Sequence, residues 1–204
     1  MPTPHTVTVA LTGASGLPYG LALIRALVAA RVRVWVLASQ AAQVVAREET
    51  DFALPAAPDA LTRFLTEMSG AEESQLRAFG REAWHAPVAS GSNPADAMVV
   101  CPCSMGTLAA IAQGMSDNLI ERAADVAIKE QKKLVLVPRE TPLSAIHLEN
   151  MLKLARLGVV ILPPAPGFYT RPQSVDDMVD FVVARILDQI GVPNTLVPRW
   201  GETR

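Results

Sequence analysis

Short apolar runs and longer amphipathic stretches alternate along most of the chain. The apolar runs are rich in β-branched residues and predict strands over residues 7–11, 32–37, 97–101, 134–137 and 159–162. Apolar residues at helical spacing predict helices over residues 21–28, 41–49, 60–68, 108–113, 118–132, 142–156 and 174–190. Continuously apolar strands separated by helices are typical of a mostly parallel sheet with helices on both faces. We therefore expect a single-domain, three-layer α/β/α fold of the Rossmann-like (flavodoxin-like) class.

The segments between these elements predict loops and helix starts. Residues 69–80 are polar, residues 82–85 predict a brief extended piece, and residues 89–94 predict a loop of small polar residues. Thr141 is expected to cap the next helix, with Pro142 at its first position. We expect the domain to span residues 1–190 and the tail, residues 191–204, to take part in subunit contacts.

The first strand ends in a glycine-rich turn, T-G-A-S-G at residues 12–16, that leads into a helix. Gly13 and Gly16 allow a tight turn, and the first N–H groups of the helix can bind an anion, most often a phosphate. An ordinary strand-to-helix turn is the alternative, because an isolated glycine loop is a weak motif. The second strand ends in Ala38-Ser39-Gln40, without the acidic residue that binds the ribose in nicotinamide-binding folds. FMN therefore fits better than NAD.

A second turn of small residues follows the strand over residues 97–101 and leads into another helix. Ser104 and Thr107 in this turn supply further N–H and hydroxyl donors, and two such turns on neighbouring strands would line one crevice. Ligands of open parallel sheets bind at the carboxyl ends of the strands. The candidates at these ends are Gly13, Ala14, Ser15, Ser39, Ser104, Met105, Gly106, Thr107, Arg139, Glu140, Phe168 and Tyr169.

Composition and charge narrow the class of protein. Of the 204 residues, half are apolar and only 19% are charged, so part of the apolar surface is expected to lie between subunits. The net charge of −2 offers no basic field for nucleic acid. No secretory leader or apolar run of membrane-spanning length is evident, which predicts a cytoplasmic protein without membrane contact. Cys101 and Cys103 are too few for a zinc site and are expected to be packing thiols.

Three basic side chains on predicted helices are candidates for a site. Arg122 and Lys129 lie seven residues apart and share a helix face, with Asp125 between them. From this spacing alone, a solvated, salt-bridged face is the favoured interpretation. Arg185 lies at the edge of the apolar face of the last helix, beyond the acids of that helix. A lone arginine there meets either a carboxylate of the protein or an anionic ligand, and the sequence favours neither.

Two carboxylates and three aromatic side chains are further candidates. Glu49 ends a predicted helix, where its charge opposes the dipole, and Glu140 directly follows a strand. Either is a surface acid or a site carboxylate that moves protons. Tyr169, in a proline-rich loop, could pack or donate a phenolic hydrogen bond. Trp84 and Trp200 lie in loop-like or terminal segments, where tryptophan often contacts a ligand or a partner.

Five segments together resemble a known family, namely residues 12–16, 101–114, 117–130, 137–143 and 163–169. They are similar to the flavin prenyltransferases of the UbiX family, whose relatives were long called aromatic acid decarboxylases. The resemblance covers essentially the whole chain. Taken together, the five segments are far more specific than one glycine turn.

The resemblance implies an enzyme that joins the dimethylallyl group of dimethylallyl monophosphate to N5 and C6 of reduced FMN, without a metal. The prenylated FMN would serve a UbiD-type decarboxylase, in ubiquinone biosynthesis or aromatic acid decarboxylation, and the enzyme would be a homododecamer. By resemblance, FMN would be held by Gly13, Ala14, Ser15, Ser39, Ser104, Met105, Gly106, Thr107 and Arg139. The prenyl phosphate would be surrounded by Arg122, Lys129, Glu140, Tyr169 and Arg185.

The resemblance also implies roles for single residues. The cations, Lys129 among them, would stabilise the negative charge on the leaving phosphate. Trp84 or Trp200 would face the developing allyl cation. Ser15 and Glu49 would relay a proton near N5, while Glu140 or the released phosphate would assist acid–base steps.

Three other functions remain open. A related flavin-dependent peptidyl-cysteine decarboxylase would carry a P-x-M-N-x-x-M-W motif and a catalytic histidine, but Asn118 lies in S-D-N-L-I and neither His85 nor His147 has that setting. A non-catalytic FMN-binding protein would need only the glycine and serine turns and would leave the cations without a role. An FMN-dependent decarboxylase acting on aromatic acids is supported by no metal or carbonyl-cofactor motif.

Overall fold

Six parallel strands form one sheet at the centre of the molecule, for which a computed structural model describes residues 4–201. The strands are β1 (Thr6–Leu11), β2 (Arg33–Ala38), β3 (Leu76–Phe79), β4 (Ala97–Cys103), β5 (Lys133–Pro138) and β6 (Val160–Ile161). Their order is β3-β2-β1-β4-β5-β6, and every neighbouring pair is parallel. This is the Rossmann order, in which the winding reverses between β1 and β4 and ligands bind beside the reversal.

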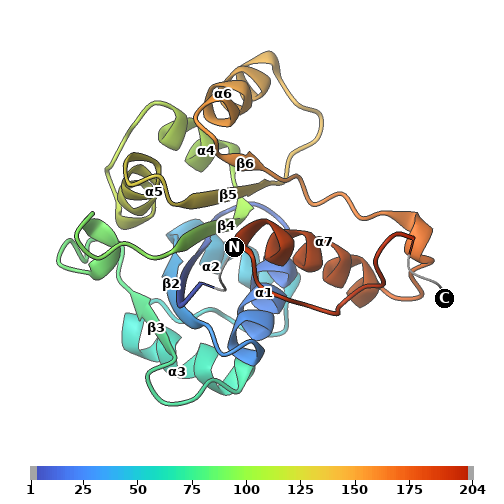
Figure 1. Ribbon diagram of the computed structural model, residues 1–204. Helices are drawn as coiled ribbons and strands as arrows, with labels where there is room; N and C mark the ends of the chain where they lie inside the picture. The colour runs from blue at the N-terminus through green and yellow to red at the C-terminus, as the bar shows by residue number, and fades with distance from the viewer. Residues whose placement is uncertain (1–3, 202–204) are drawn as a thin grey trace.

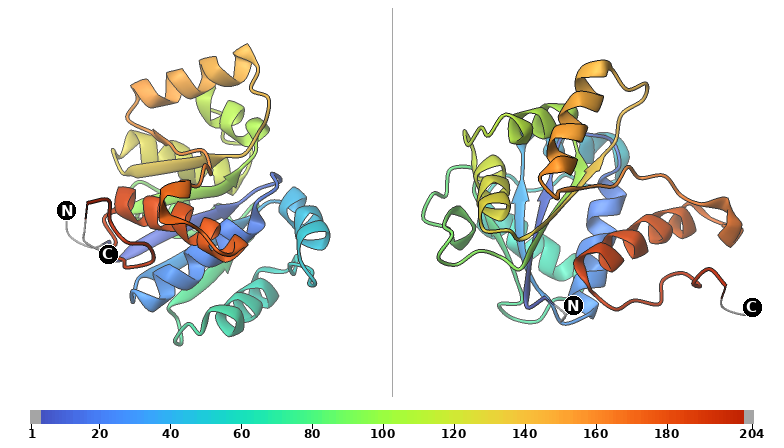
Figure 2. Two further views of the ribbon diagram at one scale, coloured as in Figure 1. Left: turned by 90° about the vertical axis from the view of Figure 1, so that its right-hand side faces the viewer. Right: turned by 45° about the horizontal axis from the view of Figure 1, so that its top comes forward.

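Helices cover both faces of the sheet, as the sequence predicts (Figures 1 and 2). One face packs against α1 (Leu17–Ala29), α2 (Gln40–Glu49), α3 (Pro58–Ser69) and α7 (Val175–Ile190). The other packs against the 3-10 turn η1 (Pro87–Ala89), α4 (Met105–Ala112), α5 (Leu119–Lys129) and α6 (Ala145–Arg156). Successive strand residues point to opposite faces, so Val9 joins the first core and Ala10 the second. Burial on both faces explains why the strands are continuous apolar runs.

Strand β3 lies in the segment that the sequence predicted to be an irregular polar stretch, and that prediction is wrong. Leu76 and Ala78 are buried against the first core, and Phe79 meets the ring of Trp35 edge-on with centroids 6.2 Å apart. The strand has only four residues, and the exposed Arg77 interrupts its apolar pattern because β3 is the edge strand. Residues 82–85, predicted to be extended, form turns instead.

Helix α6 begins three residues later than the sequence predicted. Ser144, and not Thr141, is its N-cap, because the Ser144 hydroxyl accepts a hydrogen bond from the His147 N–H while His147 Nδ1 accepts one from the Ser144 N–H, both at 3.2 Å. Pro142 precedes the helix, after a cis peptide bond. The predicted start of the last helix is confirmed, since Ser174 forms a reciprocal cap with Asp177.

The two cysteines are free and fully buried, which confirms their packing role. Cys101 belongs to the core that contains α1, and Cys103 belongs to the core that contains α4. Burial raises the pKa of both thiols well above the ordinary value, so they stay protonated at neutral pH. None of the described helices has the length and apolar character needed to cross a membrane.

Thr12 ties the ends of β1 and β4 together at the point where the winding reverses. Its hydroxyl donates to the Pro102 carbonyl and accepts from the Ser104 N–H, each at 2.8 Å. The side chain is only 1% exposed, so water does not replace these bonds. One hydroxyl thereby positions the turn that starts α4 against the turn that starts α1.

We expect Thr12→Val to lower the free energy of unfolding by about 1–3 kcal/mol, because the part-buried Ser104 N–H loses its acceptor and the buried Pro102 carbonyl loses its donor. Thr8→Val is the matched control on the same strand, since the Thr8 hydroxyl oxygen is buried without a hydrogen-bond partner in the described part of the chain. This second substitution should be neutral or stabilising. Urea unfolding of both variants makes the measurement, and equal losses would contradict the role given to Thr12.

Candidate functional site

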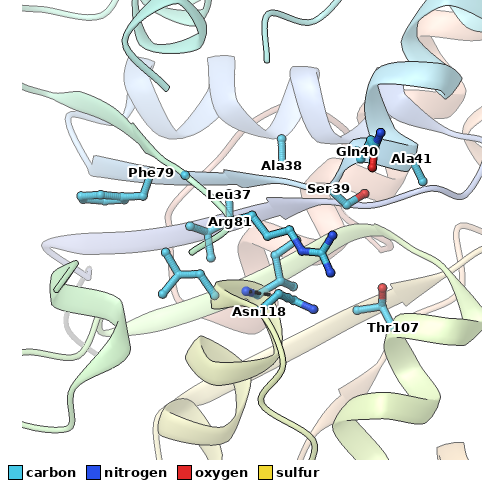
Figure 3. Close-up of a pocket in the computed structure, with 12 residues that line it drawn as sticks. Leu37, Ala38, Ser39, Gln40, Ala41, Phe79, Arg81, Thr107 and Asn118 are labelled. Atoms are coloured by element: carbon cyan, nitrogen blue, oxygen red, sulfur yellow. Dashed lines mark hydrogen bonds between the residues drawn. The ribbon is translucent and has the colours of Figure 1, made fainter. Parts of the chain in front are cut away.

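A cavity of about 290 Å³ opens at the carboxyl ends of β2 and β3 (Figure 3). Its apolar lining includes Leu37, Phe79, Leu119 and Ile120. Its polar lining consists of Ser39, Gln40, Arg81, Thr107 and Asn118. Apolar walls with a few convergent polar groups are typical of a small-molecule site, and this volume lies near the lower end of the usual range.

Three helices start around this cavity. Their N-caps are Ser39 for α2, Ser104 for α4 and Asn118 for α5. Each cap side chain accepts a hydrogen bond from its own helix: Ser39 from Ala42 N at 3.1 Å, Ser104 from Thr107 N at 3.3 Å, and Asn118 from Ile120 N at 3.0 Å. Because helix N-termini carry partial positive charge, three of them around one cavity favour an anion. The structure brings Ser39 and Thr107, two of the strand-end candidates, to one cavity.

The N-terminus of α1 is occupied by the chain itself. The Glu49 carboxylate accepts hydrogen bonds from the Gly16 N–H at 3.0 Å and from the Leu17 N–H at 2.9 Å. In this structure, Glu49 takes up these two N–H groups, and the anion site predicted at the turn stays a prediction. Glu49 ends α2, as predicted, where its charge interacts unfavourably with the dipole of α2. Its contact with the positive N-terminus of α1 offsets this interaction.

The glycine turn packs closely on the elements around it. A Cβ atom on Gly13 would collide with the Cβ of Ala41, so only glycine lets the turn approach the start of α2 this closely. Ala14 is buried, whereas Ser15 is exposed and its carbonyl accepts a 3.3 Å hydrogen bond from Arg139 Nε. The structure thus brings Ser15 and Arg139 together across the ends of β1 and β5.

The salt-bridged face predicted on α5 is confirmed. Arg122 Nη1 lies 2.8 Å from an Asp125 carboxylate oxygen, and Lys129 forms an ion pair with Glu130. The same face also contacts the loop that follows η1, because Arg122 Nε donates a hydrogen bond to the Ala89 carbonyl at 3.0 Å. Arg122 is thus held beside the end of η1, whereas Lys129 is exposed.

A second group of candidates gathers beside α7. Arg185 meets a carboxylate, with its Nη1 2.9 Å from Asp188 Oδ2, which is one of the two outcomes that the sequence left open. The ring of Tyr169 lies between Phe181 and Trp200, with centroid distances of 5.7 and 4.8 Å. Phe181 and Arg185 also line a hollow of about 340 Å³. Arg185, Tyr169 and Trp200 therefore belong to one region.

One chain does not bring all the candidates together. Arg122 and Lys129 lie on α5, whereas Arg185 and Tyr169 lie beside α7, and these helices cover opposite faces of the sheet (Figure 1). Trp84 lies in a turn and is 46% exposed, and Glu140 is exposed at the end of β5 with its carboxylate on the Thr141 N–H.

Sequence reasoning missed three polar residues that line the cavity. Gln40 and Asn118 stand at helix starts, and the cap signature of Asn118 was a usable signal. Arg81 follows β3, and because that strand was not predicted, its end residue was absent from the strand-end candidates. Among residues 4–201, no group of three or more His, Cys, Asp or Glu side chains could hold a metal ion.

Residues 1–187 match the family model described as Flavoprotein. The chain is also 61% identical to the flavin prenyltransferase UbiX of Pseudomonas aeruginosa over 202 residues, which cover 99% of this chain and 97% of the relative. The chain belongs to the UbiX family of flavin prenyltransferases. The resemblance inferred from the five segments is thereby confirmed.

Solved structures of UbiX relatives have the same fold. The dodecameric FMN-dependent UbiX-like decarboxylase of Escherichia coli O157:H7 is 43% identical, with a TM-score of 0.84, and the match covers 96% of this chain and 98% of that one. AnUbiX (PadA1), in complex with FMN and dimethylallyl pyrophosphate, is 39% identical, with a TM-score of 0.86, and the match covers 98% and 100%.

We expect Glu49→Ala to lower the free energy of unfolding by about 0.5–2 kcal/mol, because two N–H groups at the start of α1 lose their acceptor. Glu48→Ala is the control, since this neighbouring glutamate is exposed and its carboxylate makes no hydrogen bond or ion pair within residues 4–201. Urea unfolding compares the two variants. A loss of the same size in both would show that Glu49 does not cap α1.

Proposed function

We propose that this chain transfers a dimethylallyl group from dimethylallyl monophosphate to N5 and C6 of reduced FMN, without a metal. One observation carries the proposal: the cavity at the carboxyl ends of β2 and β3, with three helix N-termini around it, lies in a chain 61% identical to a flavin prenyltransferase. The relative AnUbiX, solved with FMN and dimethylallyl pyrophosphate, supports the same pair of ligands.

FMN would be held by the residues at the strand ends. Ser39 and Thr107 line the cavity, and the turn at Gly13, Ala14 and Ser15 meets Arg139 beside it. The starts of α2 and α4, which include Met105 and Gly106, suit the phosphate of a mononucleotide. When bound, reduced FMN supplies the atoms that accept the prenyl group.

The cations and the phenol would act on the leaving phosphate. The allylic C–O bond breaks with its electron pair on the phosphate, so negative charge grows there in the transition state. Arg122, Lys129 and Arg185 stabilise this charge, assisted by the Tyr169 hydroxyl. Each of these cations forms an ion pair with an acidic residue close by in the sequence, namely Asp125, Glu130 and Asp188. These ion pairs limit the positions that the charges can take.

Neighbouring subunits would complete the prenyl site. Arg122 and Lys129 cover the opposite face of the sheet from Arg185 and Tyr169, so a second copy must supply one of the two pairs. The E. coli relative is a dodecamer, and we propose the same assembly here, with residues 191–204 in the contacts; residues 202–204 of this tail lie outside the described residues. Large apolar side chains on α6 remain exposed in one chain, namely Ile146, Leu148 and Leu152.

Proton transfer would use residues close to the glycine turn. Glu49 binds the N–H of Gly16, directly after Ser15, which supports a relay through these two side chains near N5. Glu140 would assist acid–base steps from the end of β5, and Trp84 or Trp200 would face the allyl cation. A UbiD-type decarboxylase would receive the prenylated FMN, and the cytoplasmic location stays a prediction.

The name of the E. coli relative indicates a second candidate function, that of an FMN-dependent decarboxylase. A decarboxylase would release carbon dioxide from an aromatic acid and leave its FMN unmodified. The mass of the flavin recovered after reaction distinguishes the two functions, because only prenyl transfer adds a C5H8 unit.

We expect Lys129→Ala and Arg185→Ala each to slow prenyl transfer by about 10²–10³-fold, because each removes a charge that stabilises the leaving phosphate. FMN affinity should stay near the wild-type value, since neither residue lines the cavity. Flavin mass over time measures transfer, and fluorescence titration measures binding. Lys132→Ala is the control, because it removes a neighbouring lysine that precedes β5, forms no ion pair within residues 4–201 and has no part in the proposed site. Wild-type turnover in either test variant would refute the assignment.

A further inference from the structure

Arg81 is the cationic residue among those that line the cavity. Its carbonyl accepts a 2.8 Å hydrogen bond from Leu119 N, which fixes its backbone against the first residue of α5. Its side chain extends into the cavity, so that the guanidinium lies between Ser39 on one side and Thr107 on the other (Figure 3). Neither the sequence pattern nor the family resemblance assigns this residue a role.

The charge of Arg81 is uncompensated within the described residues. No hydrogen bond or ion pair joins its guanidinium to residues 4–201, whereas Arg122, Lys129 and Arg185 each form an ion pair with a carboxylate. The positive charge therefore adds to the partial charges of the three helix starts. A dianion such as a phosphate monoester is the ligand group that this end of the cavity fits best, because a guanidinium can bind two of its oxygens.

We propose that Arg81 binds the phosphate of the flavin and so increases the preference of this chain for FMN over riboflavin, a role that rests on the proposed function. Two phosphate monoesters enter the proposed reaction, and the geometry favours that of FMN. Arg81 shares the cavity with Ser39 and Thr107, whereas the cations assigned to the prenyl phosphate lie on α5 and α7 outside it. Arg81 is solvent-exposed, so its contribution is moderate and weakens with salt.

The test compares Arg81→Gln and Arg81→Lys with the wild type in titrations with FMN and with riboflavin, at low and high salt. Arg81→Gln should weaken FMN binding about three- to tenfold and leave riboflavin binding unchanged. This size lies between the effects usual for exposed ion pairs and those usual for hydrogen bonds to charged groups. Arg81→Lys should restore part of the loss, since it keeps the charge but loses the bidentate geometry. Arg77→Gln is the control, because Arg77 lies on β3, shortly before Arg81, with its guanidinium over the Phe79 ring; this variant should bind both flavins as the wild type does.

Several results would overturn the role of Arg81. An equal loss for FMN and riboflavin would assign it a structural part only, and unchanged FMN affinity would remove it from the phosphate site. A raised KM for dimethylallyl monophosphate with unchanged FMN affinity would place the prenyl phosphate there instead. If the wild-type protein binds neither flavin, the proposed function itself fails, and the riboflavin comparison separates that failure from an error about Arg81.

Discussion

A parallel sheet places the carboxyl ends of its strands at one edge, so every helix that directly follows a strand begins at that edge. Here α1, α2 and α4 begin there, and the hydrogen bond between Leu119 and Arg81 brings the start of α5 to the same place. Each start leaves N–H groups that need acceptors. Glu49 satisfies those of α1, whereas Gln40 and Ala41, the first exposed residues of α2, line the cavity. The attraction of this site for an anion is thus a consequence of the topology.

Local pattern was enough to predict much of this arrangement. Continuous apolar runs marked five of the six strands, and the small-residue turns after β1 and β4 located the edge of the sheet where the cavity lies. The sixth strand, β3, escaped because an edge strand of four residues with an exposed arginine has too short a pattern to stand out. Because β3 was not predicted, Arg81, which follows it, was not predicted to line the cavity either.

Contacts between distant segments could not be read from the sequence. The bond between Glu49 and the start of α1 joins residues more than thirty positions apart, and local reasoning saw only a carboxylate at the wrong end of its own helix. Periodicity correctly gave Arg122 and Asp125 as an ion pair, but spacing cannot show that the loop at Ala89 packs on this face. The separation of α5 from α7 on opposite faces likewise depends on topology, and the proposed completion of the prenyl site by other subunits is not encoded in local pattern.

The most direct test of prenyl transfer is the mass of the flavin extracted after the wild-type protein is incubated, without oxygen, with reduced FMN and dimethylallyl monophosphate. A flavin heavier by one C5H8 unit, formed only when protein and prenyl phosphate are both present, is the predicted result. FMN that is bound by the protein and recovered unmodified would contradict prenyl transfer and favour an FMN carrier or a decarboxylase.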